Sequence, residues 1–472
     1  MTRNKITILL LFLLLLSPVY GQTIDEARAL YANNKYEEAK PMFAKFLKSY
    51  PNNANYNFWY GVCALKTHEP EEAVKPLELA NKRRVPDAAL HLSNAYLATY
   101  RFEEAIDILE AFIKTESRRR RNTDHLEEIL EQSKLNFRML KGVEQVIVID
   151  SIVVDKSNFI DTYRLSEESG ILSYYSNGNS DALNPRPTSY QTERGNKLYH
   201  STINGAGFYQ LYMQTKLGDE WSESKPITEL NKDSVNLNYP FVLNDGVTLT
   251  YATDDKRELG GYDIMVTRYN TNTDSYLVPE NVGMPFNSIY NDYMYAIDEF
   301  NNLGWFASDR FQPKDKVCIY IFIPNKVKRT YSYESLEIEE LRKLASLENI
   351  KLTWKDEQAV KDGLQRLQFA LTYRPTTEKS GDFNFIVNDY YTYTSLKDFK
   401  TNQGREEFMK LQVMERDYKD QKKRLDQIRA EYNKESDKNK APAIIDLENR
   451  LMEMAREINK QYKLIRSLEL TK

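Results

Sequence analysis

The sequence predicts a multidomain α + β protein with a helical repeat array, a repeated β domain and a C-terminal helical hairpin. Three observations support this. The words "KYEEAKPMF", "EPEEAVKPL" and "RFEEAIDIL" place their Glu-Glu-Ala alanines 34 and 32 residues apart, a period typical of stacked helical units. From Val143, short Tyr-, Val- and Thr-rich runs alternate with Asn, Asp and Gly turns, as in β-strands. Beyond Gly404, apolar residues step by three and four over two long stretches, which indicates paired helices.

Residues 1–21 have the pattern of a secretory signal peptide. Arg3 and Lys5 precede the apolar run "ITILLLFLLLL", which is too short to span a bilayer, and cleavage is expected near Gly21. An uncleaved anchor is the alternative. No cysteine lies near this site, so no lipid anchor is expected. The sequence therefore predicts an exported, soluble mature chain.

The composition excludes a general nucleic-acid binder. The chain has 65 Lys and Arg against 69 Asp and Glu, and two of the cations are in the signal peptide. Such a mildly acidic chain lacks the basic excess that nucleic acid requires. Cys63 and Cys318 are the only cysteines and fall in different predicted domains. Two buried free thiols are expected, with a disulfide between them as the alternative.

The helical repeats share more than the Glu-Glu-Ala word. Small residues lie twelve positions before each alanine, and large apolar residues lie four positions after it: Ala27, Gly61 and Ser93, then Phe43, Leu77 and Leu109. These positions resemble the tetratricopeptide repeat over about residues 22–140, as three helix pairs and a closing helix from about Asp124 to Leu140. Paired acidic residues at the start of each second helix favour the helix dipole.

The resemblance implies a binding groove lined by the first helix of each pair. Carried over by position, the partner-binding residues are Asn55, Phe58, Val62, Lys66, Asp87, Leu90, Asn94 and Leu97. This half-apolar groove suits a helix or an extended segment of a partner; the alternative is that it packs against the chain's own next domain. The "RRRR" run at 118–121 is expected to be a solvated loop, or else a docking patch for an acidic partner.

The middle of the chain repeats about every fifty residues. Tyr199, Tyr251 and Phe306 correspond at intervals of 52 and 55 residues, and Tyr209 corresponds to Tyr262. A β repeat of this length predicts propeller blades. The phrases "NYPFVLNDGVTLTYATDD", "GGYDIMV" and "GWFASDR" resemble the TolB-type propeller, and "SGILSYYSNGN" looks like a partial blade.

This combination resembles envelope proteins of Bacteroidota, in which tetratricopeptide repeats precede a TolB-type propeller and often an OmpA-like domain. No OmpA-like domain is recognised here. The resemblance implies a periplasmic protein associated with the outer membrane through protein partners. We expect domains at 22–140, 145–400 and 401–472, with a partly helical insertion at about 330–380. In this scheme "DFNFIVNDYYTYTSL" would close the propeller ring.

No catalytic or metal-binding pattern stands out. Asn270, Asn272 and Asp274 begin like a calcium loop, but Ser275 and Asn281 replace its turn glycine and its closing carboxylate. The tip with Asp254, Asp255 and Glu258 is expected to be solvated. The four histidines lack partners at ligand spacing. We therefore expect no cofactor, no metal and no enzymatic activity, although paired carboxylates from distant loops stay open as a hydrolase site.

The last stretch predicts an antiparallel coiled-coil hairpin. One seam residue in each helix is polar, Gln421 and Gln461. The two are candidates to pair with each other, or else to fix the register of the hairpin at some cost in stability. The expected function is a non-catalytic scaffold or accessory subunit of an outer-membrane complex for secretion, protein assembly or nutrient uptake. The alternative is a glycan- or peptidoglycan-binding propeller, for which Trp221 and Trp305 are candidate stacking residues.

Overall fold

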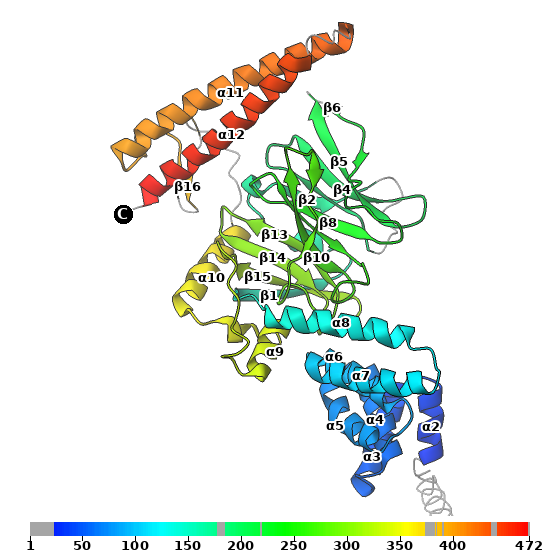
Figure 1. The fold of residues 1–472 in the computed structure, drawn as a ribbon. Coiled ribbons are helices and arrows are strands. Elements are labelled where there is room, and N and C mark those ends of the chain that lie inside the picture. Colours follow the sequence, from blue (N-terminus) through cyan, green and yellow to red (C-terminus); the bar gives the residue numbers. More distant parts are fainter. Residues whose placement is uncertain are drawn as a thin grey trace, which may run out of the picture.

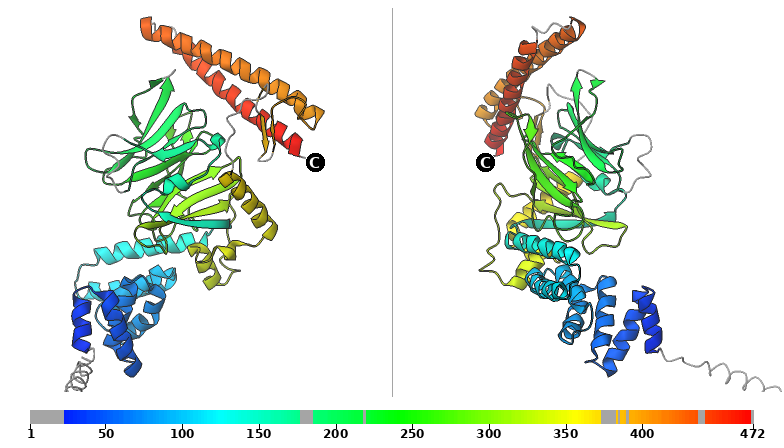
Figure 2. Two further views of the ribbon diagram at one scale, coloured as in Figure 1. Left: turned by 180° about the vertical axis from the view of Figure 1, so that it is seen from behind. Right: turned by 45° about the vertical axis from the view of Figure 1, so that its right-hand side comes forward.

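The computed structural model describes residues 23–176, 185–217, 220–372, 383, 385–388, 391–435 and 441–470. The predicted signal peptide lies outside these residues. Figures 1 and 2 show a helical array, a group of antiparallel sheets and a long helical hairpin, so the multidomain α + β prediction is confirmed. Among the described residues, no helix combines the length and the apolar character needed to cross a membrane.

The array consists of antiparallel helices joined by short turns: α2 (Ile24–Ala32), α3 (Tyr36–Ser49), α4 (Ala54–Lys66), α5 (Pro70–Lys82), α6 (Ala88–Ala98), α7 (Phe102–Arg118) and α8 (Asp124–Lys141). The turn inside each pair closes with the same backbone hydrogen bond, donated by Lys35, Glu69 and Arg101 to Leu30, Ala64 and Tyr96. The residue before each donor has a left-handed φ: Asn34, His68 and Tyr100. This repeated Schellman-type turn confirms the register of the three pairs.

The repeated small residues lie where helices approach most closely. Ala39, Ala73 and Ala105 are fully buried. A Cβ on Gly61 would come within 2.6 Å of the Leu77 side chain, so this approach between α4 and α5 requires glycine. The apolar residues four positions after the alanines are also fully buried. The Glu-Glu-Ala words therefore mark helix contacts, as the period predicts.

The β part contains three antiparallel sheets. The first has β2 (Ile171–Tyr174), β3 (Thr188–Gln191), β4 (Lys197–Ile203), β5 (Tyr209–Leu217) and β6 (Glu220–Trp221), with β7 (Lys225–Pro226) on β5. The second has β8 (Leu237–Val242), β9 (Thr248–Thr253), β10 (Asp263–Asn270) and β11 (Ser275–Tyr276), with β12 (Glu280–Asn281) on β10. The third runs β1 (Ile147–Asp155), β15 (Lys316–Ile323), β14 (Leu303–Ser308) and β13 (Asp292–Asp298). The first strand of the β part thus joins its last sheet.

A repeated polar clamp explains why these sheets share a sequence pattern. Asn236, before β8, donates its backbone and side-chain N–H groups to the Asp254 carboxylate after β9, at 2.7 and 2.6 Å. Asn291 and Asp309 repeat both bonds around β13 and β14, at 2.9 and 2.8 Å. Each asparagine also accepts from the backbone of the preceding sheet, at Tyr209 and at Tyr262 respectively. The predicted equivalence of these two tyrosines is confirmed.

One central core connects the three sheets. It includes Leu211 from the first sheet, Phe241 from the second and Trp305 from the third, all buried. The segment between β1 and β2, with the short 3-10 helices η1 (Phe159–Thr162) and η2 (Glu167–Ser169), adds Phe159 and Tyr163 to this core. The β part is built of antiparallel sheets, but a closed ring of blades is not shown.

Residues after β15 form the expected helical insertion, and one expectation is wrong. α9 (Ile338–Ser346), η4 (Ile350–Thr353) and α10 (Glu357–Thr372) pack beside the third sheet. β16 (Phe385–Asn388) and β17 (Tyr391–Tyr393) pair with each other instead of closing a ring. Phe385 and Tyr393 share a core with Phe408 and Ile465 of the hairpin. These aromatic side chains are therefore buried against the hairpin helices.

The hairpin consists of α11 (Asn402–Glu435) and α12 (Ala441–Leu470). At 1.5 Å per residue these helices are about 50 and 45 Å long. The predicted seam positions are buried or half-buried, and Leu411, Leu425, Leu451 and Ile465 are the most buried. The predicted pairing of the two glutamines is wrong. Gln461 donates to the Glu407 carboxylate at 2.6 Å, and Gln421 to Asp417 at 3.5 Å.

Candidate docking surfaces

The predicted groove lies on α4 and α6, the first helices of the second and third pairs. Asn55, Lys66 and Asp87 are exposed, whereas Phe58, Leu90, Asn94 and Leu97 are half-buried. Val62 is only 2% exposed, so it supports the groove from below and offers a partner almost no surface. The other seven predicted residues keep surface that a partner can contact, and their role in binding stays a prediction.

The two ends of this surface differ. Leu97 packs against a core that includes Leu259 and Met284 of the β part. The expectation that the groove meets the chain's own next domain therefore holds for this end. At the other end, Phe58 meets the ring of His91 edge-on, with centroids 5.5 Å apart. Phe58 and its neighbours are the part of the groove that a partner can reach.

His91 belongs to this groove, although it was not among the predicted groove residues. Burial, and then the nearby Lys66 ammonium, lower the pKa of His91 below its usual value. Its Nδ1 is buried and has no hydrogen-bond partner within the described residues. His91 follows Leu90 directly and precedes Asn94 by one helical turn, so helical spacing was the signal that could have found it.

The helical array is attached to the β part through contacts of α7 and α8. The Arg342 guanidinium of α9 pairs with Glu104 of α7 at 2.8 Å, and the Arg342 side chain is 9% exposed. Gln132 of α8 donates to the backbone carbonyls of Glu258 and Leu259 at 3.0 and 3.1 Å. Tyr100, Leu140 and Leu344 lie in the core beneath these bonds, together with the β-part residues already named. This junction fixes the orientation of the groove relative to the sheets.

The hairpin is anchored at its base. Arg466 of α12 makes a bidentate ion pair with Glu168, at 2.6 and 3.2 Å, and stacks on Phe300 at 5.1 Å. Lys463 approaches Glu299 at 3.6 Å. The residues that Arg466 and Lys463 contact, Glu168, Phe300 and Glu299, belong to the β part. Near the other end of the hairpin, Leu425 and Leu447 pack against residues of the hairpin itself. Val413 and Met452 are exposed on its outer faces, so most of the hairpin surface is available to a partner.

The charged tip between β9 and β10 is not solvated as predicted. Asp255 is 5% exposed and pairs with Arg257 at 2.6 Å and with Lys232 at 3.0 Å. The Arg257 guanidinium, against the opposing effect of burial, holds the pKa of Asp255 well below its usual range. Asp254 belongs to the clamp with Asn236, and Glu258 accepts from Asn281. These carboxylates stabilise the junction of adjacent sheets by accepting hydrogen bonds and forming ion pairs. This role explains why the residues are acidic.

The calcium-like segment is the turn between β10 and β11. The Asn272 backbone N–H donates to Asn270 Oδ1 at 3.0 Å, and Tyr269 donates to the Asp274 carboxylate. In the described part of the chain, no cluster of three or more His, Cys, Asp or Glu side chains is arranged to hold a metal ion. Cys63 and Cys318 are both free and buried, which confirms the prediction of separate thiols.

Trp305 and His200 lie inside the β part. Trp305 is fully buried in the central core, so it is a packing residue and not part of a sugar-stacking surface. His200, 1% exposed, lies between the rings of Tyr175 and Tyr212, with centroids at 3.9 and 5.7 Å. Its Nε2 is 2.5 Å from Ser224 Oγ. Burial lowers the pKa of His200 to about 4.

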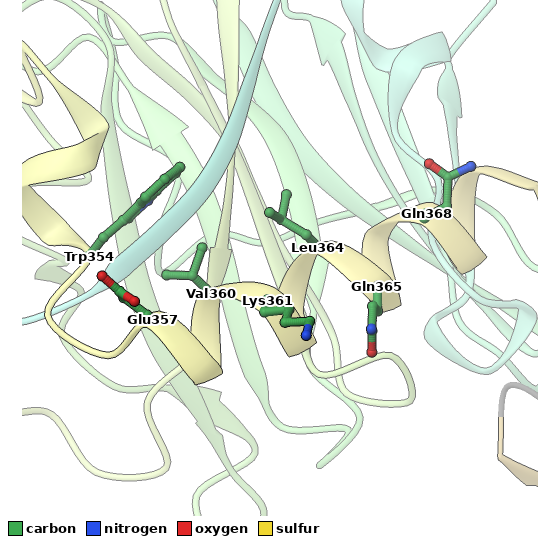
Figure 3. A pocket seen from close by; sticks show the side chains of 7 residues that line it. All are labelled: Trp354, Glu357, Val360, Lys361, Leu364, Gln365 and Gln368. Carbon is green, nitrogen blue, oxygen red and sulfur yellow. The ribbon is translucent and has the colours of Figure 1, made fainter.

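A shallow hollow of about 480 Å³ lies along α10. Figure 3 shows its lining side chains on one side of the helix, with Trp354 at one end and Gln368 at the other. Glu357 and Lys361 are the titratable residues of this lining, and both come from a single helix. The lining holds no histidine, serine, threonine or cysteine, and no nucleophile–base pair of the usual kind is assembled in it.

Comparison with known proteins supports the helical repeats. The family model of the tetratricopeptide repeat matches residues 24–84, which correspond to α2 through α5 and the turn that follows. No curated protein and no solved structure matches the chain. Tetratricopeptide repeats imply a protein–protein interaction role, and this chain carries them at its N-terminal end.

Proposed function

We propose that the chain is a non-catalytic periplasmic scaffold or accessory subunit that binds an outer-membrane protein complex. The observation that carries this proposal is the attachment of two open surfaces to one β part through ion pairs and packing. The groove is fixed through Arg342 and Glu104, and the hairpin through Arg466 and Glu168. Such an arrangement holds two protein-binding elements at a set distance, which is what a scaffold requires.

Several finer assignments belong to this proposal. The three sheets are proposed to be blades of a TolB-type propeller, supported by the repeated Asn–Asp clamp. The exported location is supported by the pattern of residues 1–21 and by the resemblance to Bacteroidota envelope proteins. Membrane association is proposed to be indirect, through protein partners. Secretion, outer-membrane protein assembly and nutrient uptake complexes are the candidate partners.

The hairpin is the first candidate for the docking arm. Its base contacts the β part, while its outer faces carry exposed apolar side chains such as Val413, Ile445 and Met452. A helical hairpin with exposed apolar residues can add to a helical surface on a partner. The groove with Phe58 and Leu90 is the second candidate, because its open end is half-apolar.

Affinity purification of the tagged full-length chain from solubilised membranes tests the proposal. A scaffold subunit returns an outer-membrane partner in stoichiometric amount. Retention on peptidoglycan at moderate salt, without any such partner, would instead support a glycan-binding role. Catalytic turnover of an ester or glycoside, abolished by changing one carboxylate, would contradict the non-catalytic assignment.

A further inference from the structure

One edge of the helical array carries clustered positive charge. The second helices α3, α5 and α7 each end in a turn that leads to the next first helix. Because successive helices are antiparallel, these three turns lie along the same edge of the array. We call this the basic edge, and all of its cations are exposed: Lys48, Lys82, Arg83, Arg84, Arg118, Arg119, Arg120 and Arg121.

Most of this charge is unpaired. The stretches 48–53, 82–87 and 118–124 contain Asp87 and Asp124 as their only acidic residues. Arg119 and Arg121 pair with Glu116, whose side chain is 7% exposed, at 3.0 and 2.7 Å. Within the described residues, the other six cations of the basic edge take part in no ion pair. The basic edge therefore presents a surplus of positive charge to its surroundings.

Helix stabilisation accounts for only part of this pattern. A cation in the last turn of a helix interacts favourably with the dipole, which explains Lys48, Lys82 and Arg118. Arg84 and Arg120 lie beyond the helix ends, and their φ angles are 60° and 56°. Glycine or asparagine adopts this left-handed conformation more easily. His68 and Tyr100 hold the equivalent left-handed position in other turns of the array. The turn therefore does not require arginine, and the positive charge at Arg84 and Arg120 is free to serve a binding role.

The basic edge is accessible because the β part lies at the opposite edge. The second helices begin at that opposite edge, and Glu104 in the first turn of α7 pairs there with Arg342 of α9. α8 begins at Asp124 beside the basic edge and ends at Lys141, from which the chain enters β1. Figure 1 shows α8 running from the outer side of the array toward the sheets. The attachment to the β part thus leaves the basic edge uncovered.

We propose that the basic edge binds an extended, Asp- and Glu-rich segment of a protein partner. The cations occur on three successive turns, so one small anion cannot contact them all. Figure 1 also shows that the helix axes rotate between the α2–α3 pair and the α6–α7 pair, so the turns do not face a common plane. A flexible polypeptide can follow this curved edge, whereas a flat bilayer cannot. The inference rests on the proposed protein-binding role, but uses a surface separate from the groove and the hairpin.

A labelled poly-aspartate peptide tests this inference on the purified full-length chain. About 12 residues suffice, because they reach roughly 40 Å when extended. Fluorescence anisotropy at low salt is expected to show binding that weakens as salt is added, because exposed charges are screened. A variant with Lys82, Arg83, Arg84, Arg118 and Arg120 changed to glutamine should bind at least tenfold more weakly. Arg119 and Arg121 are kept because they satisfy Glu116.

A matched control removes the same charge from the hairpin. Changing Arg416, Lys419, Lys422, Lys423 and Arg424 to glutamine alters five exposed cations of α11 and should leave peptide affinity within about twofold. Equal losses in both variants would overturn the inference, because net charge alone would then explain binding. Absence of binding by the unmodified chain would also overturn it, as would binding to phosphatidylglycerol vesicles with none to the peptide. This assay contains no outer-membrane partner, so its failure is distinguishable from failure of the scaffold proposal.

Discussion

Arg310 and Asp292 form the most deeply buried ion pair among the described residues, with both side chains at 0% exposure and 2.7 Å apart. The guanidinium also donates to Ser308 Oγ and to the backbone carbonyls of Pro285 and Phe286, each at 2.9 Å. Because every strong contact of the arginine lies inside the protein, the pair fixes the third sheet against the preceding loop. It is a structural element and not a reactive site.

Asp292→Asn should destabilise the protein strongly. The substitution leaves the Arg310 cation buried without its counter-charge. Such a loss typically lowers the free energy of unfolding by about 3–5 kcal/mol, and we expect at least about 3 kcal/mol here. Urea unfolding at neutral pH measures the change. Asp155→Asn is the matched control, because Asp155 and Lys316 are both exposed and such pairs contribute at most about 1 kcal/mol. Equal effects of the two substitutions would show that the buried pair has no special role.

His200 should make the stability of the β part depend on pH. Burial lowers its pKa to about 4 in the folded protein, whereas the unfolded chain has a pKa of about 6.5. Between these values only the unfolded state binds the proton, so stability falls as pH falls from about 6.5 to about 4. The loss from this residue is about 3 kcal/mol. Above pH 6.5 its contribution is constant.

His200→Phe tests this assignment, because phenylalanine can keep the stacking with Tyr175 and Tyr212 but cannot be protonated. The free energy of unfolding, measured by urea titration at several pH values, should fall less steeply below pH 6.5 in the variant. The absolute stability at neutral pH can change, so only the slope is compared. An unchanged slope would contradict the assignment of the pH dependence to His200.

At the scale of elements, the helix pairs depend on small residues at their contacts. Ala73 is fully buried and its carbonyl oxygen lies near the position that a Cβ on Gly61 would take. Ala73→Arg should therefore force a long charged side chain into this contact and cost about 3 kcal/mol or more. Thermal unfolding followed by circular dichroism measures it. Lys75→Ala, at an exposed position of the same helix, is the control and should have the melting temperature of the unmodified protein. If Ala73→Arg also had that melting temperature, the register of the helix pairs would be disproved.

The sequence predicted the helical elements well because their signals are local. The alanine period placed the helix pairs, and the heptad steps placed the seam with Leu425 and Leu451. The partners of Gln421 and Gln461 were predicted incorrectly, because glutamine reaches any acceptor nearby. The pairing of buried Asp255 with Lys232 also could not be predicted, since Lys232 lies in the connection between β7 and β8. Residues 385–388 alternate like any strand, and their packing against α12 is a long-range contact.

At the scale of the whole molecule, the junction between the array and the β part decides how the groove is oriented. The sequence did not predict this junction, because Arg342 and Glu104 are 238 positions apart and neither stands out in its own helix. The Arg342 side chain is nearly buried, so its ion pair is shielded from solvent on one side. This distinguishes it from a more exposed pair such as Glu131 and Lys134 of α8.

A double-mutant cycle with Glu104→Gln and Arg342→Gln should reveal this coupling. We expect a coupling energy of about 1–2 kcal/mol, because contacting charges that are partly shielded interact more than exposed ones. The same cycle on Glu131 and Lys134, an exposed pair of α8, should give about 0.5 kcal/mol or less. Unfolding free energies of the full-length chain supply both values. Equal coupling in the two cycles would mean that the junction does not hold the array in place.

The most direct test of the scaffold assignment combines co-purification from membranes with a hairpin variant. Leu425→Asp together with Leu451→Asp places charges in the buried seam and should melt the hairpin, while the array and the sheets keep their own cores. Gln427→Asp, at an exposed polar position of the same helix, is the control that should leave both the hairpin folded and its exposed apolar side chains intact. Circular dichroism establishes folding before the purification is compared.

The account predicts that the unmodified chain recovers a stoichiometric outer-membrane partner and that the double variant, at normal abundance, does not. Normal recovery by a chain whose hairpin has melted would move the docking role to the groove with Phe58 and Leu90. Recovery of no partner by the unmodified chain, under conditions that keep outer-membrane complexes intact, would contradict the scaffold function itself.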